Sequence, residues 1–243
     1  MNQNLFVMKR IPFILIMLIM VFGAYGQGES QSTINKTNWL LRNKRVKMNH
    51  ENPSMERNVE GSPYLSDDFL PGRVFFKGNK KPVKADLRYN AYSGEFEFTQ
   101  GGQQFVISNK SEIDSIQYKG HNFVFGSYKN EAGITRKNFM ARLVDGKCSI
   151  YKVYSREFHQ AEPPATGYDE AEPPRFEEKS PVYCIQFTDD EMPHVIDSFR
   201  RGKFLNHFGS LEKELKRYIK DQHLRLRRED DLVTFIRYYN RHY

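Results

Sequence analysis

The sequence predicts an α+β protein that is mainly β, in which an antiparallel β-meander forms a sheet or small barrel capped by C-terminal helices. Three observations predict this class. Residues 73–158 contain short runs in which apolar and polar side chains alternate, the period of a half-buried strand. Gly- and Asn-containing turns separate these runs and leave no space for crossover helices. Near the C-terminus, apolar residues recur at helical spacing instead.

The N-terminus has the features of a secretory signal peptide over residues 1–26. Two basic residues precede the apolar run 11–22, and the small residues Ala24 and Gly26 fit the positions before a cleavage site. The apolar run is shorter than the roughly 18 residues that a membrane span needs, and no Cys lies near the cleavage site for lipid attachment. We therefore expect a secreted or periplasmic protein with no transmembrane span after cleavage.

Residues 27–72 are predicted to be a polar leader or linker. Trp39 marks their one apolar cluster, and prolines and glycines interrupt the rest. The basic residues at 42–47 fit a solvated linker better than a nucleic-acid or membrane patch, given the expected export.

The β-domain is expected over residues 73–190. A ninth strand is expected at Val182–Phe187, after eight runs with strand character. The eight runs lie at 75–76, 83–89, 95–98, 105–107, 116–118, 123–125, 139–144 and 150–154.

Residues 159–181 are predicted to form a solvated proline loop within this domain. The string Ala-Glu-Pro-Pro occurs at 161–164 and again at 171–174. The loop leaves two registers open for the flanking strands. One places Cys148 opposite Cys184, and the other places Cys184 opposite Tyr154 and leaves the two thiols unbridged. We favour the second.

Residues 191–243 are predicted to be a helical cap packed on the β-domain. Two apolar stripes at helical spacing, at 211–219 and 232–239, each follow acidic residues that suit a helix N-terminus. A weaker helix is expected between Pro193 and Gly202.

No sequence motif for catalysis or for a cofactor was found, so we predict a protein that is not an enzyme and has no cofactor or metal. The sequence contains no phosphate-binding loop, dinucleotide fingerprint, zinc-helix motif or nucleophile elbow, and its His residues are scattered. Glu95 and Glu97 share a strand face and would be paired carboxylates for acid–base chemistry. Alternation with Phe96 and Phe98 is, however, the ordinary outer face of a half-exposed strand.

Several short strings are similar to secreted β-rich proteins that are common in Bacteroidetes bacteria. They are 71–76, 87–90, 95–98, 229–232 and 238–240, so the resemblance runs over most of the mature chain. That family has no established activity. The resemblance therefore implies an exported β-rich protein and assigns no functional residue.

The predicted binding surface is basic. Residues 200–243 contain 12 Lys/Arg and 6 Asp/Glu, a net charge of +6. Between the two predicted helices, Leu224 and Leu226 alternate with basic residues, so an extended link would turn the leucines inward and Arg225 and Arg227 outward. With Arg228, these arginines are the candidate partner-binding residues. Arg200, Arg201, Lys216, Arg217 and Lys220 are expected to extend the same basic surface.

After export, an acidic envelope protein, a glycan or a lipid headgroup is the expected partner, and nucleic acid is not. The alternative is a solvated helical cap with no partner. We accordingly expect a binding or scaffolding protein of the cell envelope. The rival hypothesis is a small β-barrel that carries an apolar ligand, because eight strands enclose enough space for one small molecule. An outer-membrane barrel fits less well, because these strands are short and a helical tail follows.

Overall fold

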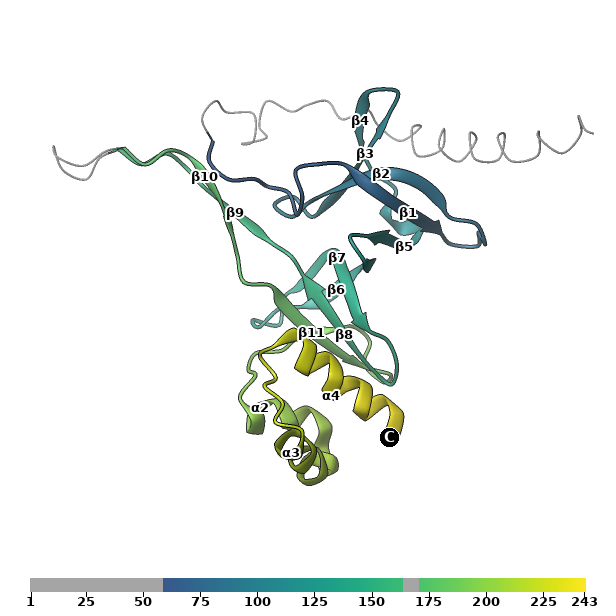
Figure 1. Ribbon diagram of the computed structural model, residues 1–243, viewed down its shortest axis with the longest axis vertical. Coiled ribbons are helices and arrows are strands. Elements are labelled where there is room, and N and C mark those ends of the chain that lie inside the picture. Colours follow the sequence, from purple (N-terminus) through teal and green to yellow (C-terminus); the bar gives the residue numbers. More distant parts are fainter. Residues whose placement is uncertain (1–58, 164–170) are drawn as a thin grey trace, which may run out of the picture.

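The computed structural model describes residues 59–163 and 171–243. The predicted signal peptide and most of the predicted leader, Trp39 included, lie outside the described residues. The described chain has an N-terminal sheet, a small barrel, a helical cap and a two-stranded arm (Figure 1). The fold is thus α+β and mainly β, as predicted.

All eight strand runs predicted for residues 73–158 are strands, and the ninth at Val182–Phe187 is confirmed as β11. The first eight are β1 (Leu70–Phe76), β2 (Val83–Asn90), β3 (Glu95–Gln100), β4 (Gln103–Val106), β5 (Ile113–Tyr118), β6 (His121–Lys129), β7 (Thr135–Val144) and β8 (Cys148–Val153), with the short helix η2 (Lys110–Glu112) before β5. The β3–β4 turn uses Gly101 and Gly102, whose φ values are +57° and +76°, a conformation that glycine adopts without steric cost.

The strand order departs from a simple meander at one place. The ten-stranded sheet runs β12-β11-β8-β7-β6-β5-β1-β2-β3-β4. β5 therefore pairs with β1 rather than with β4, its predecessor in sequence. As a result, β1 lies inside the sheet with a partner on each side.

A strand that the sequence analysis missed closes the barrel. β12 (His194–Val195) pairs with β11 on one side, and His194 pairs in parallel with Lys129 of β6 on the other. Strands β6, β7, β8, β11 and β12 thereby form a closed ring of five strands. The weaker helix expected between Pro193 and Gly202 was a wrong prediction, because residues 193–200 are extended or irregular and the first helix of the cap begins at Arg201.

Strands β6 and β7 have two buried faces. Phe123 and Phe139 face an aromatic core that they share with the N-terminal sheet, whereas Val124 and Met140 face the interior of the barrel. Because side chains alternate across a strand, one hairpin is a wall of both cores.

Phe96 lies at the centre of the aromatic core and has no exposed surface. Its ring centroid lies 4.8 Å from that of Tyr89, 5.2 Å from that of Phe123 and 5.0 Å from that of Phe139. Most of these pairs meet edge to face, the geometry that aromatic quadrupoles favour. The N-terminal sheet is thus packed onto the outside of β6 and β7 by aromatic rings.

The helical cap packs on the outer face of the barrel. It contains α2 (Arg201–Leu205), η3 (Asn206–Leu211), α3 (Glu212–Asp221) and α4 (Glu229–His242). Both predicted helices are present, and their predicted stripes supply the buried residues Leu215, Ile219, Leu232, Phe235 and Ile236. These side chains meet Ile150 of β8 and Ile185 of β11.

One side-chain amide fixes α4 on β8. Asn240 Oδ1 accepts a hydrogen bond from the Cys148 backbone N–H, and Asn240 Nδ2 donates to the Cys148 carbonyl, both at 2.8 Å. The amide thus satisfies both backbone groups of a residue beneath the helix.

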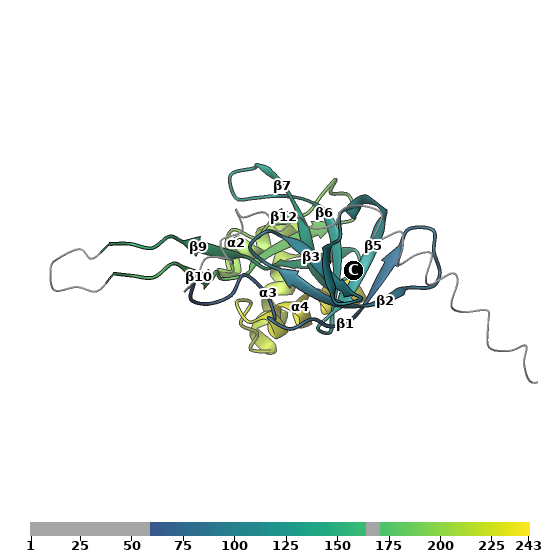
Figure 2. The ribbon, with the colours of Figure 1, turned by 90° about the horizontal axis from the view of Figure 1, so that it is seen from above.

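Both described ends of the predicted proline loop join a β-ribbon. β9 (Arg156–His159) pairs with β10 (Arg175–Glu178), and the ribbon projects from the body as an arm (Figure 2). The two copies of the Ala-Glu-Pro-Pro string face each other, because Glu162 and Glu172 exchange backbone hydrogen bonds of 3.0 Å. The solvation was predicted correctly, since Glu162, Glu172, Glu177 and Glu178 are exposed. The pairing was not predicted, although the Glu before each proline pair keeps the backbone N–H that proline lacks.

Cys148 and Cys184 are both free, which agrees with the prediction of unbridged thiols. The predicted register was wrong, because Cys184 lies opposite Tyr151 and not opposite Tyr154. Cys148 faces the helical cap and Cys184 faces the barrel interior. The two thiols therefore point to opposite faces of one sheet, where no disulfide geometry is possible.

We expect two reactive thiols on protein that is denatured without reductant, and almost none on folded protein. Burial raises the pKa of the Cys148 thiol and raises that of Cys184 to about 12, so little nucleophilic thiolate forms at neutral pH. A colorimetric thiol count checks both numbers. A count of zero on the denatured, unreduced protein would contradict the register.

Candidate functional site

The linker that carries the predicted binding residues is a turn rather than an extended strand. The backbone N–H of Arg228 donates to the carbonyl of Arg225 at 2.8 Å. Leu226 is nevertheless buried with 5% of its surface exposed, and Arg225, Arg227 and Arg228 are all exposed. The alternation correctly predicted which side chains point inward, although the backbone conformation was wrong.

The charges around this linker are only partly compensated. Arg228 lies 4.0 Å from Asp231, and the same carboxylate accepts the backbone N–H of Arg225 at 2.9 Å. Within the described residues, the side chains of Arg225 and Arg227 have no ion-pair partner. The structure therefore brings the three predicted arginines together on one turn, with two of their charges uncompensated.

The neighbouring cations predicted to extend this surface lie in or beside the helices of the cap (Figure 1). Arg217 pairs with Asp221 at 3.5 Å, although its side chain is 86% exposed. The other four, which are Arg200, Arg201, Lys216 and Lys220, are also exposed. We predicted that these five cations form one continuous basic surface with the linker, and this stays a prediction.

A second polar cluster lies where α4 begins. Glu229 Oε2 accepts a hydrogen bond from Lys152 Nζ at 2.6 Å and another from the Tyr183 hydroxyl at 2.8 Å. Lys152 lies over the Tyr154 ring at 4.8 Å, and the Tyr154 hydroxyl lies 3.4 Å from His121 Nε2. Strands β6, β8 and β11 and helix α4 thus each contribute a titratable group.

The pKa shifts in this cluster do not favour acid–base catalysis. Burial would raise the pKa of Glu229, but the hydrogen bonds from Lys152 and Tyr183 and the charge of Lys152 outweigh it and hold that pKa below its ordinary value. Burial would lower the pKa of Lys152, but Glu229 and Tyr154 outweigh it and raise that pKa. Burial lowers the pKa of His121. A catalytic acid needs a raised carboxyl pKa and an amine nucleophile needs a lowered amine pKa, which are the opposite of the shifts at Glu229 and Lys152. We therefore interpret the cluster as a contact that joins α4 to the barrel.

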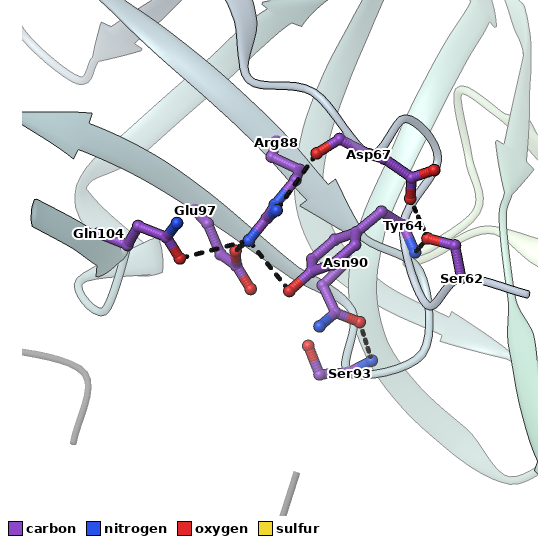
Figure 3. A network of polar contacts seen from close by, with 8 residues as sticks. All are labelled: Ser62, Tyr64, Asp67, Arg88, Asn90, Ser93, Glu97 and Gln104. Atoms are coloured by element: carbon purple, nitrogen blue, oxygen red, sulfur yellow. Dashed lines mark hydrogen bonds and ion pairs between the residues drawn. The ribbon is translucent and has the colours of Figure 1, made fainter. Parts of the chain in front are cut away.

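A third cluster surrounds Arg88 on β2 (Figure 3). Its guanidinium pairs with Glu97 at 2.6 Å, with each side chain only 13% exposed. It also donates to the Tyr64 hydroxyl at 3.0 Å and lies 3.7 Å from the Tyr64 ring centroid and 4.3 Å from that of Phe69. Cation–π stacking and charge pairing together hold residues 62–69 on the sheet.

The candidate carboxylate pair is also engaged by cations. Glu95 pairs with Lys110 at 3.2 Å, and Glu97 pairs with Arg88. The two carboxylates therefore act as partners of separate cations, which supports their interpretation as the outer face of a strand.

Neither a metal site nor a similar protein points to a function for the described chain. No group of three or more His, Cys, Asp or Glu side chains in residues 59–163 and 171–243 could hold a metal ion. In the same ranges, no helix is both long and apolar enough to span a bilayer. Comparisons with protein-family models, curated proteins and solved structures found no match.

A row of polar side chains that was not predicted from the sequence crosses the sheet on the face opposite the aromatic core. It includes Lys84, Arg73 and Arg142, which come from three strands. No local signal marks them as neighbours, because only the pairing of strands distant in sequence brings them together.

Replacing Glu229 by Gln should lower the free energy of unfolding by about 1 kcal/mol at pH 7, the size of a partly screened charged hydrogen bond. Because the pKa of Glu229 is lowered in the folded state, its contribution is complete above the unfolded value. It disappears as the pH falls through the folded value. Denaturant unfolding at pH 7 measures the contribution of the charged carboxylate, and unfolding below about pH 4 measures its loss on protonation.

The matched control is Asp230→Asn, which removes the same charge from the next residue of α4, where the side chain is exposed. We expect it to have little effect at either pH. An equal loss of unfolding free energy in both variants would mean that the charge at the helix N-terminus stabilises the protein, and not the contact of Glu229 with Lys152 and Tyr183.

Proposed function

We propose that the protein is an exported, non-catalytic binding or scaffolding protein of the cell envelope, and that it holds an anionic partner through its helical cap. The observation that carries this proposal is the exposed turn with Arg225, Arg227 and Arg228, of which two have no ion-pair partner in the described chain. The predicted signal peptide and the resemblance to exported β-rich proteins support the compartment.

The acidic side chains of the cap support this proposal. Glu229 is bound by Lys152, Asp221 pairs with Arg217, Asp231 accepts from Arg225 and approaches Arg228, and Glu214 accepts from the Tyr243 hydroxyl at 2.7 Å. Of the 12 Lys and Arg residues at 200–243, only Arg217 and Arg228 form an ion pair in the described chain, so most of the positive charge of the cap is left for an external anion.

The packing of the barrel gives less support to the rival hypothesis of an apolar-ligand carrier. Met140, Tyr151, Val153 and Cys184 fill the barrel interior and are each at most 8% exposed. A five-stranded ring is also narrower than the eight-stranded barrel that the hypothesis assumed.

The triple variant R225E/R227E/R228E should lose at least about tenfold in its association with envelope fragments at low ionic strength. Each basic residue near an anionic surface contributes about 1 kcal/mol, and salt screens the interaction. Co-sedimentation with envelope fragments of the host, at low and at high salt, measures the loss. A separate thermal unfolding curve reports whether the variant folds.

The matched control is K77E/K80E/K81E, which reverses three exposed charges at the β1–β2 turn. We expect it to sediment with the fragments like the wild type. Undiminished association of the arginine variant would refute the cap as the binding surface, and an equal loss in both variants would show that only net charge matters.

A further inference from the structure

A row of polar side chains crosses five strands on the face of the sheet opposite the aromatic core. Strand register places Lys84 of β2 beside Arg73 of β1, and Arg73 beside Gln117 of β5. The row continues from Gln117 to Asn122 of β6 and then to Arg142 of β7. At about 4.8 Å between strands, it is about 19 Å long.

These side chains point away from the aromatic core. Their neighbours along the strands, which include Val74, Ile116 and Phe123, belong to that core and have no exposed surface. Since successive side chains alternate between faces, the polar row lies on the opposite face. On β2, β1 and β5 that face is the outside of the sheet, and on β6 and β7 it is the face that Val124 and Met140 turn to the barrel. Lys84, Arg73 and Gln117 are exposed there.

Two adjoining hollows, of about 650 and 390 Å³, follow this row. They share Pro71, Gly72 and Arg73. The first extends to Lys84, Asp86 and Thr99 on β2 and β3, and the second extends to Gln117, Lys119 and Asn122 on β5 and β6. We call the two hollows together the sheet groove.

The sheet groove contains cations without an ion-pair partner and a hydrogen-bond acceptor without a donor in the described chain. Within the described residues, neither Arg73 nor Lys84 forms an ion pair, whereas Arg142 at the end of the row lies 3.3 Å from Asp145. The cations that line the two hollows, Arg73, Lys84 and Lys119, outnumber their one carboxylate, that of Asp86. Asn122 Oδ1 is buried, and no described group donates a hydrogen bond to it. Buried acceptors in native proteins normally have a partner, so this one fits a group supplied from outside the chain.

We propose that the sheet groove binds a linear anionic oligosaccharide. Arg73 and Lys84 face its carboxylate or sulfate groups, and the amides of Gln117 and Asn122 bond to its hydroxyls. The outward side chains of the groove include no aromatic ring, which single-stranded nucleic acids need for base stacking. Charge and hydrogen-bonding capacity together thus favour an acidic sugar chain.

This site is independent of the proposed function of the helical cap. The groove is lined by residues of β1, β2, β3, β5 and β6. The cap packs on the outer face of β8 and β11, two strands that do not line the groove. A protein with both surfaces would bridge an acidic glycan and a second anionic partner.

Isothermal titration calorimetry with three linear hexasaccharides tests the site: a heparin-derived one, an oligogalacturonate and neutral maltohexaose. The wild type should bind at least one anionic chain at low salt and should not bind maltohexaose. R73A/K84A should weaken this binding about tenfold, because two unscreened contacts to the anion are lost. N122D should also weaken it, because it places a negative charge where the amide acceptor was.

R136A/K137A is the matched control, since it removes one exposed Arg and one exposed Lys from β7 outside the groove. It should bind like the wild type. So should R225E/R227E/R228E, which separates this site from the helical cap. Absence of binding by the wild type, equal binding of maltohexaose, or an equal loss in R136A/K137A would overturn the proposal.

Discussion

The burial of both faces of the β6–β7 hairpin is the constraint on which the rest of the structure depends. Phe123 and Phe139 complete the aromatic core of the N-terminal sheet, while Val124 and Met140 line the barrel. A slip of one residue in the pairing would exchange these two sets. The register is therefore fixed from both sides, and neither core can form fully without the hairpin.

The same arrangement repeats in β8 and β11, so that three cores lie in series. Tyr151 and Cys184 face the barrel, and Ile150 and Ile185 face the helices. Because the walls of the barrel are covered on both sides in this way, the polar groups that are free to meet a partner lie on the outer surfaces. The helical cap and the sheet groove are two such surfaces, and they lie on different elements of the fold.

Local patterns predicted most of the elements, but the sequence did not predict how distant elements meet. Alternation predicted β2 and β3, β-rich runs between turn residues predicted β1, β4 to β8 and β11, and helical spacing predicted α3 and α4. These patterns missed three short strands: β12, which has two residues, and β9 and β10, which have four residues each. Alternation also predicted that Leu226 points inward and Arg225 outward, because this depends only on neighbours in the chain.

The sheet groove depends on pairings that the sequence does not contain in local form. Arg73 reaches Gln117 only because β5 pairs with β1 across more than thirty intervening residues. A prediction from successive hairpins places β5 beside β4 instead and disperses the row. The Arg88–Glu97 contact, by contrast, spans one hairpin with a Ser93-Gly94 turn, and a local register would have found it.

Native-state hydrogen exchange of Met140→Ala tests most directly whether β6 and β7 join the cores into one cooperative unit. Met140 lies in the barrel and contacts neither the N-terminal sheet core nor the cap core. Truncating a buried Met costs about 2–5 kcal/mol. The account predicts that the most protected amides of β2 and of α4 lose the same free energy of exchange. Unchanged protection in β2, or separate unfolding transitions for sheet and cap, would contradict it.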